Sequence, residues 1–200
     1  VLHALSHGAR QVVVVTSAGP REGASTTAAG LARVLALSGH RVVLVGGDLR
    51  SPSAVGAPGA PGLAEVLVGT ARLSQVLVEG EVPGLELLPA GDMPGNPSEL
   101  LGGRNMSDLL HHLAADRIVI IDAPPVCRFT DAVVLAEYAG GVLLVARAGR
   151  TSAEELREAA LAVGQGGGHM LGVVLTNVSD LGRGSRSAQT AVTHAESATV

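Results

Sequence analysis

The chain has 200 residues, which suits one domain with or without a tail. Hydrophobic residues make up 46% of it and aromatic residues only 1%, so its core must be aliphatic, as in buried parallel strands covered by helices. The formal net charge of -4 argues against a nucleic-acid-binding protein, and the single cysteine, Cys127, excludes an internal disulfide and fits a reducing compartment. All 14 basic residues are arginine, so the chain contains no lysine.

The hydrophobic pattern predicts strands that alternate with helices. Continuous aliphatic runs predict strands at 11–17, 41–47, 85–91, 117–125, 141–149 and 169–177. Helical periodicity and capping residues predict helices at 24–38, in short segments over 63–78, at 96–115 with a break at Gly102–Gly103, at 130–139 and at 151–164. A Pro/Gly-rich loop follows the second strand at 51–62. This alternation predicts an α/β fold with a mainly parallel central sheet and helices on both faces, a three-layer arrangement.

Residues 1–178 are expected to form a single domain. Residues 179–200 are rich in Ser, Thr and Arg without clear periodicity and are expected to form a polar tail that packs weakly. No apolar run approaches the roughly 18–20 residues that a membrane span needs, and we find no signal peptide. Because the chain begins with valine, it could be part of a longer, membrane-bound protein.

The first strand is followed by a segment with the spacing of a phosphate-binding loop. Residues 18–25, AGPREGAS, match [Ala/Gly]-x4-Gly-Lys-[Ser/Thr], with alanine at the lysine position. Backbone N–H groups of such a loop surround phosphate oxygens at a helix N-terminus. Taken alone, a glycine-containing turn between strand and helix is about as often purely structural. The candidate nucleotide-binding residues here are Gly19, Arg21, Glu22, Gly23, Ala24, Ser25 and Thr26.

Two aspartates follow other predicted strands. Asp48 comes after the strand at 41–47, and Asp122 ends the apolar part of the strand at 117–125. Both are candidate catalytic residues, and with the hydroxyl of Ser25 they are candidate ligands for Mg²⁺. A capping role in a turn is the alternative for each. Their joint placement beside the loop, at strand ends that meet at one sheet edge, favours a ligand site.

Several stretches in order resemble the cytoplasmic P-loop domain of bacterial tyrosine kinases, which regulate capsule and exopolysaccharide synthesis. They are DLRSPS, similar to the family's second Walker-like motif Asp-x-Asp-x-Arg-x-Pro, then LPAGDMPGNPSELL, IIDAPPV, VLLVARAGRTS and LGVVLTNV, and together they cover roughly 11–178. The related Min-type and Par-type positioning ATPases lack LPAGDMPGNPSELL. The resemblance implies a P-loop NTPase fold, ATP or ADP with Mg²⁺ as ligands, and a base contact near Asn177, where the register is off by one. It also implies a membrane polysaccharide co-polymerase or chain-length regulator as partner, separate or fused, and a cytoplasmic location at the inner face of the plasma membrane.

Departures from the family pattern weaken the expected chemistry. The family loop Pro-Gly-Glu-Gly-Lys-Ser-Thr reads PREGAST here, so Arg21 replaces a glycine and Ala24 replaces the lysine. Gly46 stands where the second motif has its first aspartate, which the family uses in Mg²⁺ handling and catalysis. The single tyrosine, Tyr138, precedes the tail, so the tail lacks the family's tyrosine cluster.

We therefore expect a catalytically impaired, tyrosine-kinase-like domain that regulates polysaccharide synthesis or export and binds nucleotide weakly or residually. One alternative is an active kinase or ATPase in which Arg21 or a partner's cation replaces the lysine. Another is a positioning ATPase of the Min or Par type. The sequence does not decide whether Ala24 is natural or engineered, or whether the chain forms a homo-oligomer. No nucleic-acid partner is expected.

Overall fold

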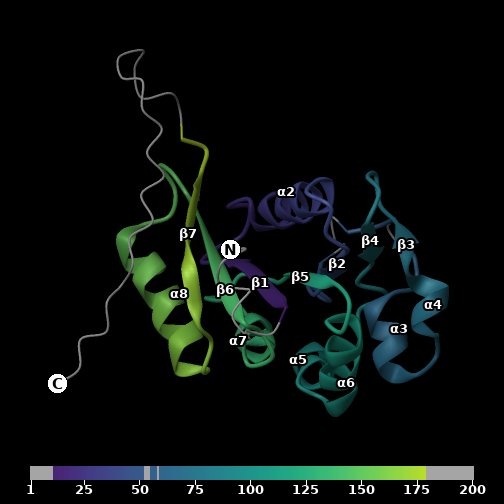
Figure 1. Ribbon diagram of the computed structural model, residues 1–200. Coiled ribbons are helices and arrows are strands. Elements are labelled where there is room, and N and C mark those ends of the chain that lie inside the picture. The colour runs from purple at the N-terminus through teal and green to yellow at the C-terminus, as the bar shows by residue number, and fades with distance from the viewer. Residues whose placement is uncertain (1–10, 52–54, 58, 179–200) are drawn as a thin grey trace.

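The computed structural model describes residues 11–51, 55–57 and 59–178, and within them one seven-stranded sheet has the order β3-β4-β2-β5-β1-β6-β7 (Figure 1). Five neighbouring strand pairs are parallel, and only β3 and β4 are antiparallel. The predicted mainly parallel sheet is therefore confirmed. The strands are β1 (Val12–Ser17), β2 (Val42–Gly46), β3 (Val78–Glu79), β4 (Leu85–Leu88), β5 (Ile118–Asp122), β6 (Gly141–Arg147) and β7 (Met170–Thr176).

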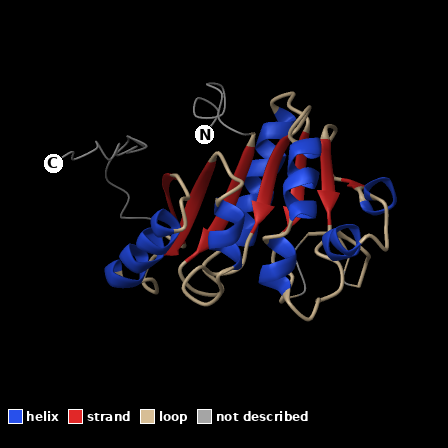
Figure 2. Cartoon of the chain, turned by 90° about the horizontal axis from the view of Figure 1, so that it is seen from below, coloured by secondary structure: helices blue, strands red, loops and turns tan. Residues whose placement is uncertain are grey.

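Helices cover both faces of this sheet, as predicted (Figure 2). Successive strand residues point to opposite faces, so β1 sends Val13 and Val15 toward α2 and sends Val12 and Val14 toward the other helices. The helices are α2 (Ala24–Leu37), α3 (Leu63–Val68), α4 (Leu73–Val76), α5 (Pro97–Leu101), α6 (Arg104–Leu113), α7 (Asp131–Ala136) and α8 (Ala153–Gln165). Because both faces are covered, β1, β2 and β5 are buried along their whole length.

The sheet differs from the sequence prediction at one edge. The short helical segments predicted over 63–78 are α3 and α4, but Val78 belongs to the short strand β3, in which Val78 pairs with Leu87 and Glu79 with Glu86. Such a short antiparallel strand covers the outer edge of β4 and gives its backbone groups partners. The predicted break at Gly102–Gly103 is confirmed, because α5 ends before it and α6 begins after it.

Two further expectations concern the ends of the chain and its membrane relation. The predicted polar tail, 179–200, lies outside the described residues, as do residues 1–10. Among the residues that the structure describes, no helix is both long and apolar enough to cross a membrane.

Candidate nucleotide site at the strand ends

The loop after β1, the segment after β2 and the segment after β5 meet at one edge of the sheet. The N–H of Gly47 donates to the carbonyl of Asp122 (2.8 Å), and the N–H of Val126 donates to the carbonyl of Ser17 (2.9 Å). These bonds fasten the three strand ends together. The segments at these strand ends surround a cavity of about 460 Å³. It is lined by Ser17, Pro20, Arg21, Glu22, Gly23, Ala24, Ser25, Thr26, Asp48, Ser51, Ala123, Pro125, Arg128 and Phe129.

The backbone of the phosphate-type loop is held from the β6–β7 side of the sheet. The carbonyl of Arg21 accepts a hydrogen bond from the guanidinium of Arg147 (3.1 Å), and the carbonyl of Glu22 accepts one from the hydroxyl of Thr176 (2.6 Å). Gly23 has a φ of 101°, and a Cβ added there would lie 3.2 Å from Cγ2 of Thr176. The glycine is therefore needed both for the left-handed backbone and for the close approach of β7.

The side chain of Glu22 is an internal anchor of the loop. It is only 4% exposed, and its Oε1 accepts a hydrogen bond from the hydroxyl of Thr151 (2.7 Å). Its Oε2 is buried without a hydrogen-bond partner among the described residues. The sequence predicts Glu22 as a residue of the nucleotide site. In the structure Glu22 lines the cavity, and its carboxylate is hydrogen-bonded to Thr151, just before α8.

Of the two predicted acidic residues, Asp48 lines the cavity, whereas Asp122 is buried at the end of β5 and is not among the lining residues. Burial raises the pKa of Asp122 to about 6, the nearby charge of Asp48 also raises it, and a side-chain hydrogen bond with Ser25 opposes the change. Burial likewise raises the pKa of Asp48, against the lowering effect of the backbone N–H groups of Arg50 (3.0 Å) and Ser51 (3.2 Å), which donate to its carboxylate. Asp48 thus caps its own turn and also lines the cavity, and its role as a metal ligand stays a prediction.

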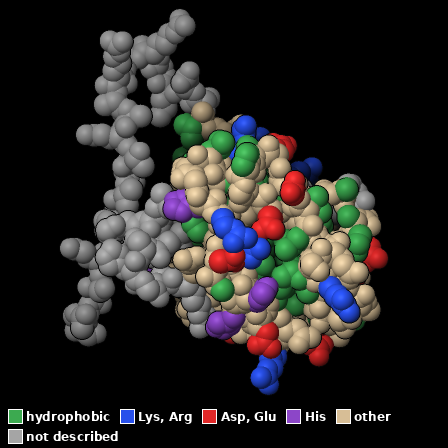
Figure 3. All heavy atoms as spheres, turned by 45° about the vertical axis from the view of Figure 1, so that its right-hand side comes forward, with side chains coloured by type: hydrophobic (Ala, Val, Ile, Leu, Met, Phe, Trp, Pro, Cys, Tyr) green, Lys and Arg blue, Asp and Glu red, His purple; other side chains and the backbone are tan. Residues whose placement is uncertain are grey.

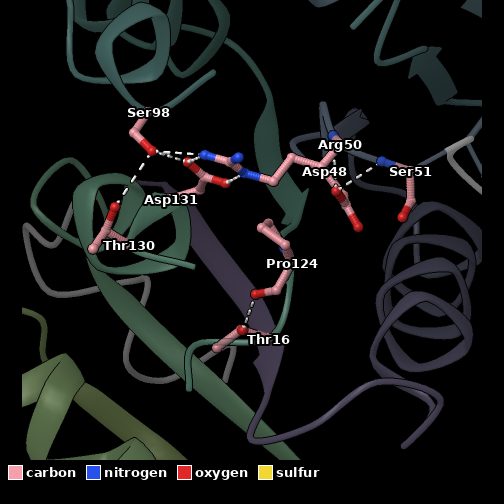
Figure 4. Close-up of polar contacts among 8 residues, drawn as sticks. All are labelled: Thr16, Asp48, Arg50, Ser51, Ser98, Pro124, Thr130 and Asp131. Carbon is pink, nitrogen blue, oxygen red and sulfur yellow. Dashed lines mark hydrogen bonds and ion pairs between the residues drawn. The ribbon is translucent and has the colours of Figure 1, made fainter. Parts of the chain in front are cut away.

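Arg50 holds the segment after β2 against α5 and α7 (Figure 4). Its guanidinium pairs with the buried carboxylate of Asp131 (2.5 and 3.1 Å) and donates to the hydroxyl of Ser98 (3.0 Å), which in turn donates to Asp131. The guanidinium also lies 4.7 Å from the ring centroid of Phe129. Sequence reasoning found Arg50 within a motif but missed its partners, because Ser98 and Asp131 stand 48 and 81 residues away.

Most of the predicted site residues come together, and a few lie to the side. Gly19 is not among the cavity-lining residues; its carbonyl accepts a hydrogen bond from the hydroxyl of Ser17 (2.8 Å). Asn177 is exposed, has a φ of 54° and stays only a predicted base contact. Gly46 ends β2 directly opposite Asp122, so no second carboxylate stands there. Arg128 lines the cavity although sequence reasoning did not single it out.

The oxygen donors present suit Mg²⁺ that arrives with a nucleotide. Ser25, Asp48 and Asp122 offer one hydroxyl and two carboxylates, and Mg²⁺ is usually bound by one or two carboxylates together with substrate phosphates. Among the described residues no group of three or more His, Cys, Asp or Glu side chains could hold a metal ion by itself. The arrangement fits a metal shared with phosphate, not an all-protein metal centre.

Known proteins show the same fold. In the kinase domain of the Escherichia coli tyrosine kinase ETK, 29% identical, the match covers 94% of this chain and 75% of that domain with a TM-score of 0.84. The septum site-determining protein MinD of Pyrococcus horikoshii OT3, solved with Mg-ADP, matches with a TM-score of 0.67 at 19% identity, over 84% of this chain and 72% of that one. At that identity the likeness to MinD concerns the fold alone.

Curated relatives identify the family, although no protein-family model matches the chain. The chain is 36% identical over 167 residues to the tyrosine-protein kinase YwqD of Bacillus subtilis (strain 168), which covers 82% of this chain and 70% of YwqD. It is 34% identical over 179 residues to the tyrosine-protein kinase ptk of Acinetobacter johnsonii, which covers 88% of this chain but only 24% of ptk. The chain thus spans most of YwqD and about a quarter of ptk. It belongs to the family of bacterial tyrosine-protein kinases.

Proposed function

We propose that this chain is a catalytically impaired member of its family that regulates capsule or exopolysaccharide synthesis or export and retains a weak site for ATP or ADP with Mg²⁺. One observation carries the proposal. Ala24 lines the cavity at the start of α2, where the phosphate-binding loop has its lysine, and the chain contains no lysine that could take its place.

The missing charge affects binding less than catalysis. A charged hydrogen bond to phosphate contributes roughly 1.5–3 kcal/mol, so its loss should weaken nucleotide binding by roughly 10- to 150-fold. Comparable cationic groups contribute on the order of 10³–10⁵ to the rate of phosphoryl transfer. Gly46 adds to this deficit, because it faces Asp122 without a carboxylate of its own. We therefore expect phosphoryl transfer to be very slow.

Several parts of a nucleotide site remain. The loop keeps the shape set by Gly23, and α2 starts directly after it, so its N-terminus favours an anion at this place. Ser25 and the two aspartates are the residues that would hold Mg²⁺, which neutralises charge on the phosphates when it is bound. Asp122 must be ionised for this role, so its raised pKa makes metal-dependent binding sensitive to pH near 6.

The partners and location follow from the family resemblance and are part of the proposal. The partner is a membrane polysaccharide co-polymerase or chain-length regulator, on a separate or the same chain, at the cytoplasmic face of the plasma membrane. A nucleic acid is not expected, because the net charge is -4 and basic and acidic side chains lie side by side on the face in Figure 3. Several arginines are paired with acids, as Arg117 is with Glu86 (2.6 Å) and Asp116 (2.7 Å).

An active kinase is the second candidate, and one observation favours it. Two arginines, Arg21 and Arg128, line the cavity, so positive charge is present near the position of the absent lysine. Measurable phosphotyrosine formation with Mg-ATP, lost in Asp122→Asn, would establish this alternative and contradict the impaired form.

Calorimetric titration with ADP-Mg and ATP-Mg tests the proposal on the wild-type chain, Ala24→Lys and Leu37→Lys. Leu37→Lys is the matched control, because it adds the same charge to α2 at an exposed position outside the cavity. We expect weak binding by the wild type, roughly 10- to 150-fold tighter binding by Ala24→Lys, and no gain in the control. The absence of binding in both the wild type and Ala24→Lys would show that the cavity is not a nucleotide site.

A further inference from the structure

Two positively charged side chains, Arg21 and Arg128, are among the described residues that line the cavity. A third arginine nearby, Arg50, is engaged by the buried carboxylate of Asp131. The guanidinium of Arg128 has no ion-pair or hydrogen-bond partner within the described ranges, and its side chain is exposed. It is therefore available to an anion that enters the cavity.

The backbone that carries Arg128 is fixed against the phosphate-type loop. The hydroxyl of Thr16 donates to the carbonyl of Pro124 (2.7 Å), a bond visible in Figure 4, and the N–H of Val126 donates to the carbonyl of Ser17. The N–H of Arg128 then donates to the carbonyl of Pro125 (3.0 Å), which closes a turn. The segment after β5 is thus fastened to the end of β1, from which the loop begins.

The next residue along the chain fixes this turn from its other side. The N–H of Phe129 donates to the same carbonyl of Pro125 (3.2 Å), and the Phe129 ring lies 4.7 Å from the guanidinium of Arg50. Arg50 is itself held by Asp131. A side chain on so well supported a backbone loses little backbone freedom when it binds a ligand, which favours affinity.

The acidic residues at the cavity also favour a positively charged side chain on the segment after β5. Asp48 lines the cavity, and Asp122 lies at the end of β5 beside Ser25. Two carboxylates repel a nucleotide unless a metal or a side chain offsets them. Arg21 belongs to the loop itself, at a φ of 61°, whereas Arg128 reaches the cavity from the segment after β5.

We infer that Arg128 is the phosphate-binding cation of this site and supplies, from the β5 side of the cavity, the positive charge that the loop lacks at residue 24. An arginine suits this role, since its guanidinium can donate two parallel hydrogen bonds to one phosphate group. The role concerns affinity for the bound nucleotide, not the rate of transfer. The inference rests on the nucleotide binding proposed above.

Arg128→Gln tests the inference by calorimetric titration with ADP-Mg, next to Arg21→Gln and the matched control Arg33→Gln. Arg33 is exposed on α2 and does not line the cavity, so its substitution removes the same charge elsewhere. We expect Arg128→Gln to bind ADP roughly 10- to 150-fold more weakly than the wild type. We expect Arg128→Lys to bind with intermediate affinity, and Arg33→Gln to bind like the wild type. Melting of the nucleotide-free proteins should show nearly equal stability, because the Arg128 side chain makes no hydrogen bond or ion pair with the residues that the structure describes.

The outcomes separate this inference from the function on which it rests. Binding by the wild type together with unchanged affinity in Arg128→Gln would overturn the inference and leave the proposed nucleotide site standing. A loss confined to Arg21→Gln would assign the cation to the loop instead. An equal loss in Arg33→Gln would show a general effect of net charge and would also overturn the inference. No binding by the wild type would refute both.

Discussion

Removal of the Arg50 side chain tests how much the hydrogen-bonded group of Arg50, Asp131 and Ser98 contributes to stability. The side chain of Asp131 is 1% exposed and that of Arg50 is 29% exposed. In Arg50→Ala, Asp131 keeps its hydrogen bond with Ser98 but loses its only described ion pair. Loss of one partner of a buried ion pair costs about 3–5 kcal/mol, because the remaining charge stays buried. Partial exposure of Arg50 places the expected loss near the lower end, at about 3 kcal/mol.

Urea denaturation measures this loss, and thermal melting should show a fall of about 6–12 °C for a chain of this size. Arg104→Ala is the control, because the pair of Arg104 with Asp108 is 3.7 Å long and its side chains are 91% and 70% exposed. We expect that control to lose less than about 0.5 kcal/mol. The double variant Arg50→Ala/Asp131→Ala should be more stable than Arg50→Ala alone, since the buried charge is gone. The reasoning fails if Arg50→Ala loses no more stability than Arg104→Ala.

Three further predictions follow from contacts described above. The pKa of Asp122, about 6 in the folded protein against an ordinary 3.8, means that the folded state binds the proton more tightly, so the free energy of unfolding should fall by up to about 3 kcal/mol as pH rises from about 4 to about 6. Urea titrations over this range should show a flatter dependence in Asp122→Asn, and parallel curves for the two proteins would contradict the assignment. Thr151→Val should cost about 1–3 kcal/mol, because Oε1 of the buried Glu22 loses its donor, while Thr70→Val, which removes an exposed hydroxyl, should cost little. Gly30→Ala should stabilise α2 by about 0.5–1 kcal/mol, since outside the helix's own backbone no atom lies within 4 Å of the added Cβ, and a lower melting temperature would refute this.

Most of the sheet could be predicted from the sequence because its central strands are continuous apolar runs. The edge strand β3 could not be predicted. Both faces of β1, β2 and β5 are covered, so each reads as an unbroken aliphatic stretch. The strand β3 has only two residues, Val78 and Glu79, both exposed, and so carries no periodic pattern. Its pairing with β4 depends on how the chain returns through Gly80 and Gly84, which no local pattern records.

In the candidate site, too, residues of one short segment could be predicted from the sequence, whereas residues brought together from distant segments could not. The spacing of the loop pointed to residues that line the cavity, because one short segment, 20–26, supplies half of the lining residues. Arg128 has no motif of its own and reaches the cavity only because β5 lies next to β1 in the sheet. The pairing of Arg50 with Asp131 likewise joins residues 81 apart, which only the folded chain brings together.

The anchoring of the loop carbonyls by Arg147 and Thr176 separates the shape of the site from its chemistry. These bonds come from strands β6 and β7 and act on the backbone at residues 21 and 22, so they do not depend on the side chain at residue 24. A lysine can therefore be lost at that position without loss of the loop's architecture. Under the proposed function, the loop would keep its shape after the loss of the lysine, so this chain could lose catalysis without a change in the backbone that surrounds the cavity.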